Sequence, residues 1–380
     1  MKNHELVLKG GRVIDPANNI DRITDIAFSG GTVSAVGDDL DGKTSRDVSG
    51  QIVTPGLIDL HTHVYWGGTS LGIDPDEFMR NSAVTTAIDT GSAGPGNFAG
   101  FRKHVIEPAK ARILAFLHIS HAGIFGFSNR IMVGESENLS LMDPVTAVEV
   151  AKANPDVIVG IKVRLGLHAS SIHGAAPLGI ALQVAEESGL PLMVHIDEPP
   201  PTYAEVVSRL RPGDILTHCF RAFPNAPVDG KGRIRAEVWE ARRRGVIFDI
   251  GHGMASFSYK TARAALADGF APDCISSDVH QLCIGGPAYD QVTTLSKFLA
   301  LDMTLPDVIA ASTIAPARAL RRPELGSLTP GGPGDASILS LEDGSFDLED
   351  VLGEIVTAPQ MIRAKAVVRA GEWIECKGHS

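Results

Sequence analysis

The sequence predicts an α/β protein: a (β/α)8 TIM barrel that carries a small composite β-sandwich built from both ends of the chain. Two observations support this prediction. From about residue 54 onward, apolar strand-like runs alternate with helical stretches, a pattern typical of a parallel sheet covered by helices. Before residue 54 and after about residue 325, short β-like runs separated by turn residues indicate antiparallel strands instead.

The first 53 residues are expected to contribute one half of the small β domain. Gly, Asn and Asp turns such as Gly30-Gly31 separate several short runs of β-forming residues. These runs lie at residues 6–8, 12–14, 25–28 and 33–36.

Residues 54–324 contain eight strand candidates, which is the number that a (β/α)8 barrel requires. Amphipathic stretches between them are expected to be helices, at residues 145–153, 178–188, 204–210, 234–244 and 261–267. The strands are expected to end near His63, Gly91, Ser120, Arg164, Ile196, Cys219, Ile250 and Asp278.

Strand-like character returns in residues 325–380, at residues 335–339 and 366–369, after a glycine-rich turn at residues 331–334. Neither end of the chain has enough strands for a core of its own. We therefore expect residues 1–53 and 325–380 to form one β-sandwich domain beside the barrel domain of residues 54–324.

Composition excludes several classes of partner. The 380 residues carry a formal net charge of -11, which argues against a nucleic-acid surface or a basic membrane patch. The chain start lacks the positively charged region and apolar core of a secretory signal, and no apolar run approaches the length that crosses a membrane. We expect a cytoplasmic protein that acts on a small molecule.

Two histidines close the first strand of the predicted barrel. Residues two apart in a strand face the same way, so His61 and His63 direct two imidazoles toward one point. An isolated His-x-His pair is a weak motif. This one follows a Pro55-Gly56 turn and a buried-type strand, at the carboxyl end where barrel enzymes carry their chemistry.

Four more polar residues end apolar runs further along the chain. Each alone is compatible with a hydrogen-bonded core side chain or a helix cap. Together they would converge at one end of a barrel, as a polar cluster that a protein would hardly bury without a metal. These residues are Lys162, His195, His218 and Asp278.

The order of these parts resembles the amidohydrolase superfamily, in particular its two-metal branch, over nearly the whole chain. The resemblance is carried by the opening Gly10-Gly11-Arg12-Val13-Ile14-Asp15-Pro16, the strand Pro55-Gly56-Leu57-Ile58-Asp59-Leu60-His61-Thr62-His63, the ordered Lys162, His195, His218 and Asp278, and Ala315-Pro316-Ala317-Arg318-Ala319-Leu320.

The resemblance implies two divalent metal ions, commonly zinc, and a carbamylated Lys162. A free ammonium group has no lone pair, whereas a carbamate supplies two anionic oxygens that can each bind one ion. The implied ligands are His61, His63 and Asp278 on one ion, His195 and His218 on the other, and Lys162 between them. The same resemblance implies attack by a metal-bridging hydroxide, with Asp278 as the catalytic residue that takes its proton and delivers it to the leaving group.

Four further residues are candidates for substrate contact. Arg164 lies two residues beyond Lys162, so its guanidinium could face the same interior and bind a carboxylate, unless it forms a salt bridge at the rim. Arg130 and Arg221 compete for this role from predicted loops. The other three candidates are His280, His252 and Tyr65.

Dihydroorotases, which belong to this superfamily, typically continue His-x-His-x-Arg, whereas this chain has Tyr65 at the position of that arginine. The chain is more similar to the dihydroorotase-like amidohydrolase/deacetylase group. That resemblance implies hydrolysis of an acyl group, notably acetyl, from an N-acyl amino acid or an O-acyl hydroxy acid. Ring opening of a cyclic amide by a dihydroorotase-type enzyme is the alternative.

A one-metal deaminase and a non-catalytic scaffold are also compatible with parts of the sequence. His195-Ile196-Asp197-Glu198 resembles the His-x-x-Glu pattern of one-metal deaminases, in which Glu198 would move protons during deamination of a heterocycle. Some relatives keep the barrel only as an assembly scaffold after losing ligands, but all six ligand types are present here. Relatives are often oligomeric, so we expect a homo-oligomer.

Overall fold

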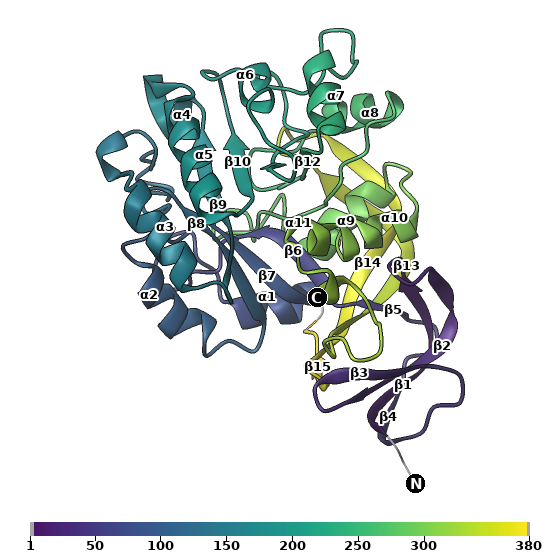
Figure 1. Ribbon diagram of the computed structural model, residues 1–380. Coiled ribbons are helices and arrows are strands. Elements are labelled where there is room, and N and C mark those ends of the chain that lie inside the picture. The colour runs from purple at the N-terminus through teal and green to yellow at the C-terminus, as the bar shows by residue number, and fades with distance from the viewer. Residues whose placement is uncertain (1–3, 378–380) are drawn as a thin grey trace.

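The computed structural model describes residues 4–377, which form a mixed α/β fold with two sheets (Figure 1). The seven strands of the parallel sheet follow one another in chain order, from one edge of the sheet to the other. They are β6 (Leu57–Thr62), β7 (Val84–Thr90), β8 (Arg112–His118), β9 (Ile158–Leu165), β10 (Leu192–Ile196), β11 (Ile215–Leu216) and β12 (Ile247–Phe248).

The segment after Pro272, where the eighth strand is expected, lies between the two edges of this curled sheet. Cys274 forms a parallel bridge with Asp249 just beyond β12, and Val279 forms one with Thr62 at the end of β6. The backbone N–H of Asp278 donates to the carbonyl of His61 at 2.7 Å. The predicted parallel α/β sheet is therefore confirmed, whereas a closed eight-stranded barrel stays a prediction.

Helices cover the outer face of the parallel sheet, and all five helices predicted from the sequence are present (Figure 1). None of the helices within residues 4–377 combines the length and the apolar character needed to cross a membrane. The α-helices are α1 (Pro75–Ser82), α2 (Phe98–Phe101), α3 (Pro144–Ala153), α4 (Leu167–Ser170), α5 (Ala176–Ser188), α6 (Tyr203–Val207), α7 (Ala236–Arg243), α8 (Tyr259–Ala267), α9 (Gln291–Leu299), α10 (Leu305–Ala310) and α11 (Ile314–Ala319).

The second sheet joins the two ends of the chain, as the sequence predicts, but as one eight-stranded sheet with mostly antiparallel pairs. The C-terminal strand β13 pairs with β5, which in turn pairs with β1. The strands are β1 (His4–Asp15), β2 (Ile20–Ser29), β3 (Thr32–Gly37), β4 (Gly42–Asp47), β5 (Ile52–Pro55), β13 (Ala336–Glu349), β14 (Ile355–Arg369) and β15 (Glu372–Glu375).

Strand β1 differs from the expectation, because the two short runs predicted at residues 6–8 and 12–14 belong to one strand. The register against β2 shifts between Leu8 and Gly11, and Gly10 has φ +73°. Glycine adopts this left-handed conformation without the steric penalty of a side chain, so the chain passes through a β-bulge and the strand continues.

Apolar side chains fill both faces of the parallel sheet. The main core lies between the sheet and its helices, and a smaller cluster that includes Phe116, Met193 and Ile215 fills the concave face. Met193 Sδ lies 3.5 Å from Lys162 Nζ, so this inner cluster forms the apolar base beneath the polar residues at the strand ends.

Candidate metal centre

The histidine pair stands at the end of β6, and both imidazoles face Asp278. Asp278 Oδ1 lies 3.2 Å from His61 Nε2 and 3.2 Å from His63 Nε2. The two rings are buried, with centroids 5.5 Å apart. The strand alternation inferred from the sequence thus brings both Nε2 atoms to one point.

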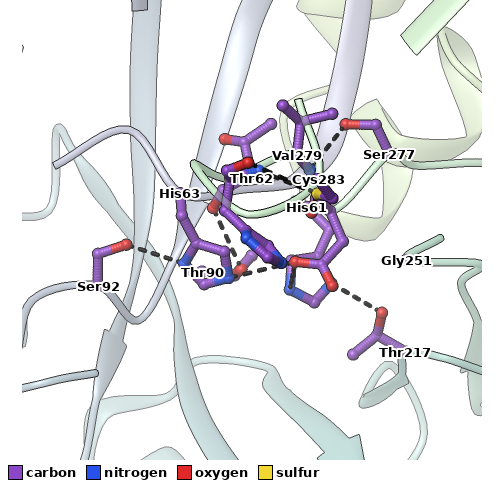
Figure 2. Close-up of polar contacts among 12 residues, drawn as sticks. His61, Thr62, His63, Thr90, Ser92, Thr217, Gly251, Ser277, Val279 and Cys283 are labelled. Carbon is purple, nitrogen blue, oxygen red and sulfur yellow. Dashed lines mark hydrogen bonds and ion pairs between the residues drawn. The ribbon is translucent and has the colours of Figure 1, made fainter. Parts of the chain in front are cut away.

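The other ring nitrogen, Nδ1, of each histidine is hydrogen-bonded to a hydroxyl group outside the cluster. His61 Nδ1 is 2.8 Å from the hydroxyl of Thr217, which donates to Asp249 Oδ2 at 2.7 Å. His63 Nδ1 is 2.9 Å from the hydroxyl of Ser92 (Figure 2). A histidine bound through Nδ1 keeps its ring orientation and leaves Nε2 for a metal.

The other three predicted ligands lie on neighbouring strand ends. Lys162 Nζ, on β9, is 3.4 Å from His61 Nε2. The ring of His218, just after β11, has its centroid 5.1 Å from that of His61 and 4.5 Å from that of His195 on β10. His218 Nδ1 is held 2.7 Å from the carbonyl oxygen of Gly251. The structure therefore brings all six predicted residues together.

Burial decides the protonation of this cluster. It lowers the pKa of His63 to about 3, and it moves the pKa values of His61 and His218 well below the usual range. Burial also lowers the pKa of Lys162 to about 7 and raises that of Asp278 to about 6. Neutral imidazoles keep the lone pair that a metal needs, and a lysine with so low a pKa has access to its uncharged amine.

These residues fit a divalent metal. Within residues 4–377, Asp278 Oδ1 and His195 Nε2 are buried without a hydrogen-bond partner. One nitrogen each of His61 and His218 and one oxygen of Asp278 lie within 4.8 Å of one another. Buried imidazoles and a carboxylate left unpaired in this way are the usual ligands of zinc and similar ions.

The cluster opens into a cavity of about 370 Å³. Two of the four predicted substrate-contact residues, Arg164 and His280, line it together with apolar side chains such as Phe127 and Leu71. Burial lowers the pKa of His280 to about 4, so this ring is neutral. Their contact with a substrate stays a prediction.

The other two substrate candidates, His252 and Tyr65, are not part of the cavity wall. His252 is buried, with Nε2 2.7 Å from Lys297 Nζ and its ring stacked on Phe257. The ring of Tyr65 packs against Phe101 at a centroid distance of 4.6 Å. Their positions next to site residues in sequence do not bring them to the site, because the chain turns away after each strand end.

Several polar residues around the site were not predicted from the sequence. Thr217 and Ser92 contact Nδ1 of His61 and His63, and Glu135 lies fully buried beside Arg164, with its Oε2 3.0 Å from Arg164 Nη1. Thr217 precedes His218 at a strand end, which is a usable signal. Glu135 stands in a long loop without periodicity, so nothing in the local sequence marks it.

Comparison with known proteins places the chain in a family. It is 36% identical to a curated deacetylase of Agrobacterium fabrum over 355 residues, which cover 92% of this chain and 86% of that protein. It is 30% identical to a curated deacetylase of Enterococcus faecalis over 376 residues, or 97% of this chain and 99% of the relative. The chain belongs to the dihydroorotase-like deacetylases of the amidohydrolase superfamily. As a member of this superfamily it is a metal-dependent hydrolase.

Solved structures of amidohydrolases have the same fold. A crystal structure described as a dihydroorotase superimposes with a TM-score of 0.91 at 33% identity, over 99% of this chain and 100% of that one. One described as an adenine deaminase has a TM-score of 0.91 at 30% identity, over 98% and 100% of the two chains. A D-hydantoinase at 14% identity and a TM-score of 0.70 shares the fold alone. No family model matches the chain.

Proposed function

We propose that this amidohydrolase is a deacetylase, which removes an acetyl or similar acyl group from an amide or ester of a small carboxylate-bearing compound. The observation that carries the proposal is the convergence of His61, His63 and Asp278 on one point at the base of the cavity. Curated relatives named deacetylase, which align with nearly the whole chain, support the acyl group as the target.

In this proposal six side chains hold two divalent ions, with zinc as the first candidate. Lys162, as a carbamate, would be a ligand of both ions, and carbamate formation requires an uncharged amine, which the lowered pKa of Lys162 favours. His61, His63 and Asp278 would hold the first ion, and His195 and His218 the second.

The chemistry then divides between the metals and the chain. Divalent ions held here would acidify a water molecule and polarise the scissile carbonyl. Asp278, whose pKa burial raises to about 6, is placed to take the proton of the attacking water and pass it to the leaving nitrogen or oxygen. The apolar floor around Met193 keeps further water away from the cluster.

We also infer the finer architecture from these contacts. Residues 274–279, bridged to both edges of the parallel sheet, would be the eighth strand of a (β/α)8 barrel. Residues 1–53 and 325–380 would form the composite β domain beside the barrel of residues 54–324. A homo-oligomer acting on a small molecule stays our expectation for the assembly.

Ring opening and deamination have less support than deacetylation. Similarity to a curated dihydroorotase of Citrifermentans bemidjiense reaches 48% identity but spans only 21% of this chain. Deamination requires Glu198 beside the metal, whereas its side chain is 46% exposed, with its nearest ion-pair partner, His168, 3.9 Å away. That position suits the cavity mouth better than proton transfer at the cluster.

Turnover by the zinc-loaded protein tests the proposal. We expect hydrolysis of members of a panel of N-acetyl amino acids and O-acetyl hydroxy acids, and an activity loss of about 1000-fold or more in Asp278→Asn, because proton transfer and a ligand are lost together. Asp343→Asn, at an exposed position of β13, is the matched control. Hydrolysis of dihydroorotate or deamination of adenine, with no turnover on the acyl panel, would refute the proposal.

A further inference from the structure

Arg164 stands on the rigid part of the cavity wall. It belongs to β9, two residues beyond Lys162 and on the same face of the strand. Its side chain is only 10% exposed, and it lines the cavity together with His195 and His280. A buried guanidinium has lost most of its hydration, so it requires an anionic partner, and Glu135 supplies one.

Glu135 and Phe127 hold this guanidinium in place. Arg164 Nη1 donates to Glu135 Oε2 at 3.0 Å, and the guanidinium carbon lies 5.1 Å from the centre of the Phe127 ring. Among residues 4–377 this is the single hydrogen bond that the Arg164 side chain makes. The planar group is therefore oriented by one ion pair and one ring, and most of its five N–H donors are left for another acceptor.

His118 lies against the other carboxylate oxygen of Glu135. The backbone N–H of Ser120 donates to His118 Nδ1 at 2.8 Å, so the proton of the neutral ring is on Nε2, which faces Glu135 Oε1 at 3.2 Å. Burial raises the pKa of Glu135, but Arg164 and His118 outweigh this effect and hold it below its usual value. Glu135 is thus a buried carboxylate, and it keeps Arg164 in one orientation.

We propose that Arg164 binds the carboxylate of the substrate through its remaining donors, and that Glu135 is the positioning residue that aims it. The inference rests on the proposed function, since it names the group that recognises the acid end of the acylated substrate. The planar guanidinium group of Arg164 matches a carboxylate in geometry and charge. Because its orientation is already fixed, it loses little entropy when it binds.

The two competing arginines are less suitable. Arg221 also lines the cavity, and its Nε is buried without a hydrogen-bond partner among the described residues, but its Nη1 is bonded to the carbonyl of Ile196. It stands in the loop after β11, whereas Arg164 stands on strand β9 beside Lys162. Arg130 is exposed on the turn of the short hairpin at residues 126–133 and is not part of the cavity wall. Arg130 therefore offers a control substitution in the loop that also carries Phe127 and Glu135.

Matched pairs of neutral and acidic compounds test the inference in the zinc-loaded protein. Each N-acetyl amino acid that is turned over is compared with its primary amide, which has the same shape without the charge. For Arg164→Met we expect kcat/KM to fall about 100-fold for the acid, because a charge-assisted hydrogen bond is lost. For the amide it should fall less than about threefold. Arg164→Lys, with the charge but not the planar group, should lose about tenfold, and Arg130→Met should match the wild type.

Glu135→Gln tests the positioning role. Its amide oxygen can still accept from Arg164, so we expect a loss of about tenfold in the preference for the acid, expressed in KM more than in kcat, at unchanged zinc content. A merely structural role would lower acid and amide turnover equally. If this variant does not fold, Phe127→Leu, which removes the ring beside the guanidinium, should reduce the same preference.

Calorimetry separates this inference from the proposed function. The probes are 2-amino and 2-hydroxy acids with apolar side chains, each compared with its primary amide, because their binding does not depend on turnover. If the wild type binds the acids more tightly than the amides and Arg164→Met does not, Arg164 binds the carboxylate, even where no acyl compound is hydrolysed. Equal binding of acids and amides by the wild type, or an unchanged preference in Arg164→Met, would overturn it.

Discussion

At the scale of single residues, the hydrogen bond at Nδ1 of each of three histidines determines how its ring is oriented in the site. His61, His63 and His218 all use Nδ1 for a partner outside the cluster, and these partners come from three different segments of the chain. The Nε2 atoms of His61 and His63 are therefore directed toward Asp278 before any metal binds. Such preorganisation reduces the ordering that metal binding has to impose.

Lys162 offers the most direct test at this scale. We expect Lys162→Ala to reduce the bound metal from two ions to one or none and to lower activity about 100-fold or more, because the bridging carboxylate is lost. A short-chain carboxylic acid added to this variant should restore part of the activity. Elemental analysis and a rate assay measure the two effects.

Lys152, exposed in the last turn of α3, provides the control substitution for this test. Lys152→Ala should keep both metals and full activity. Full activity in Lys162→Ala would contradict the bridging role.

At the scale of elements, the segment that follows β12 packs its backbone directly against the carboxylate of Asp278. Gly253 has φ +54°, and a Cβ atom at this position would lie 2.3 Å from Asp278 Oδ2. The backbone N–H of Gly253 also donates to the carbonyl of Ser277 at 2.9 Å. This segment therefore determines where Asp278 can stand.

We expect Gly253→Ala to displace Asp278 and reduce kcat about 100-fold, the usual cost of a misplaced catalytic group. Gly269, at the end of α8, has φ +80° and open space around its Cβ position. Gly269→Ala should lose about 1–2 kcal/mol of stability from the same left-handed backbone, with normal kcat. Similar kcat values for both variants would show that the contact with Asp278 does not matter.

At the scale of the whole molecule, the two sheets share one core. The hairpin of β13 and β14 begins in the sheet of the chain ends, and its far residues, such as Leu348 and Ile362, belong to the main core of the parallel sheet. Lys297 on α9 joins the same hairpin, because its ammonium group donates to the carbonyl of Glu349 at 2.7 Å. The main core of the parallel sheet therefore includes part of the C-terminal hairpin.

Removal of the metal should lower the thermal stability of the whole molecule. At a free metal concentration about 1000 times Kd, binding contributes about 4 kcal/mol, which for a chain of this size corresponds to a Tm about 5 °C higher. We therefore expect dialysis against a chelator to lower Tm by this amount and zinc to restore it, measured by calorimetry. If the chelator removes the zinc and Tm does not change, the metal does not stabilise the folded protein.

The sequence alone was enough to predict the alternation of strands and helices, the pairing of the two chain ends and the six residues at the strand ends. The alternation and the positions of the strand ends depend on short-range rules, because side-chain alternation and hydrophobic periodicity repeat within each segment. The seven parallel strands end within a few residues of the expected positions for this reason. The pairing of the two chain ends was inferred because neither end has enough strands for a core of its own.

Only the tertiary structure decided which loop residues reach the site. His252 and Tyr65 stand close to site residues in the sequence yet contact Lys297 and Phe101, whereas Glu135, far from any motif, holds Arg164. Loop conformation depends on contacts between residues distant in the chain, and no local pattern encodes these contacts. Strand ends are therefore predictable from the sequence, while the residues that surround the substrate depend on how the loops pack.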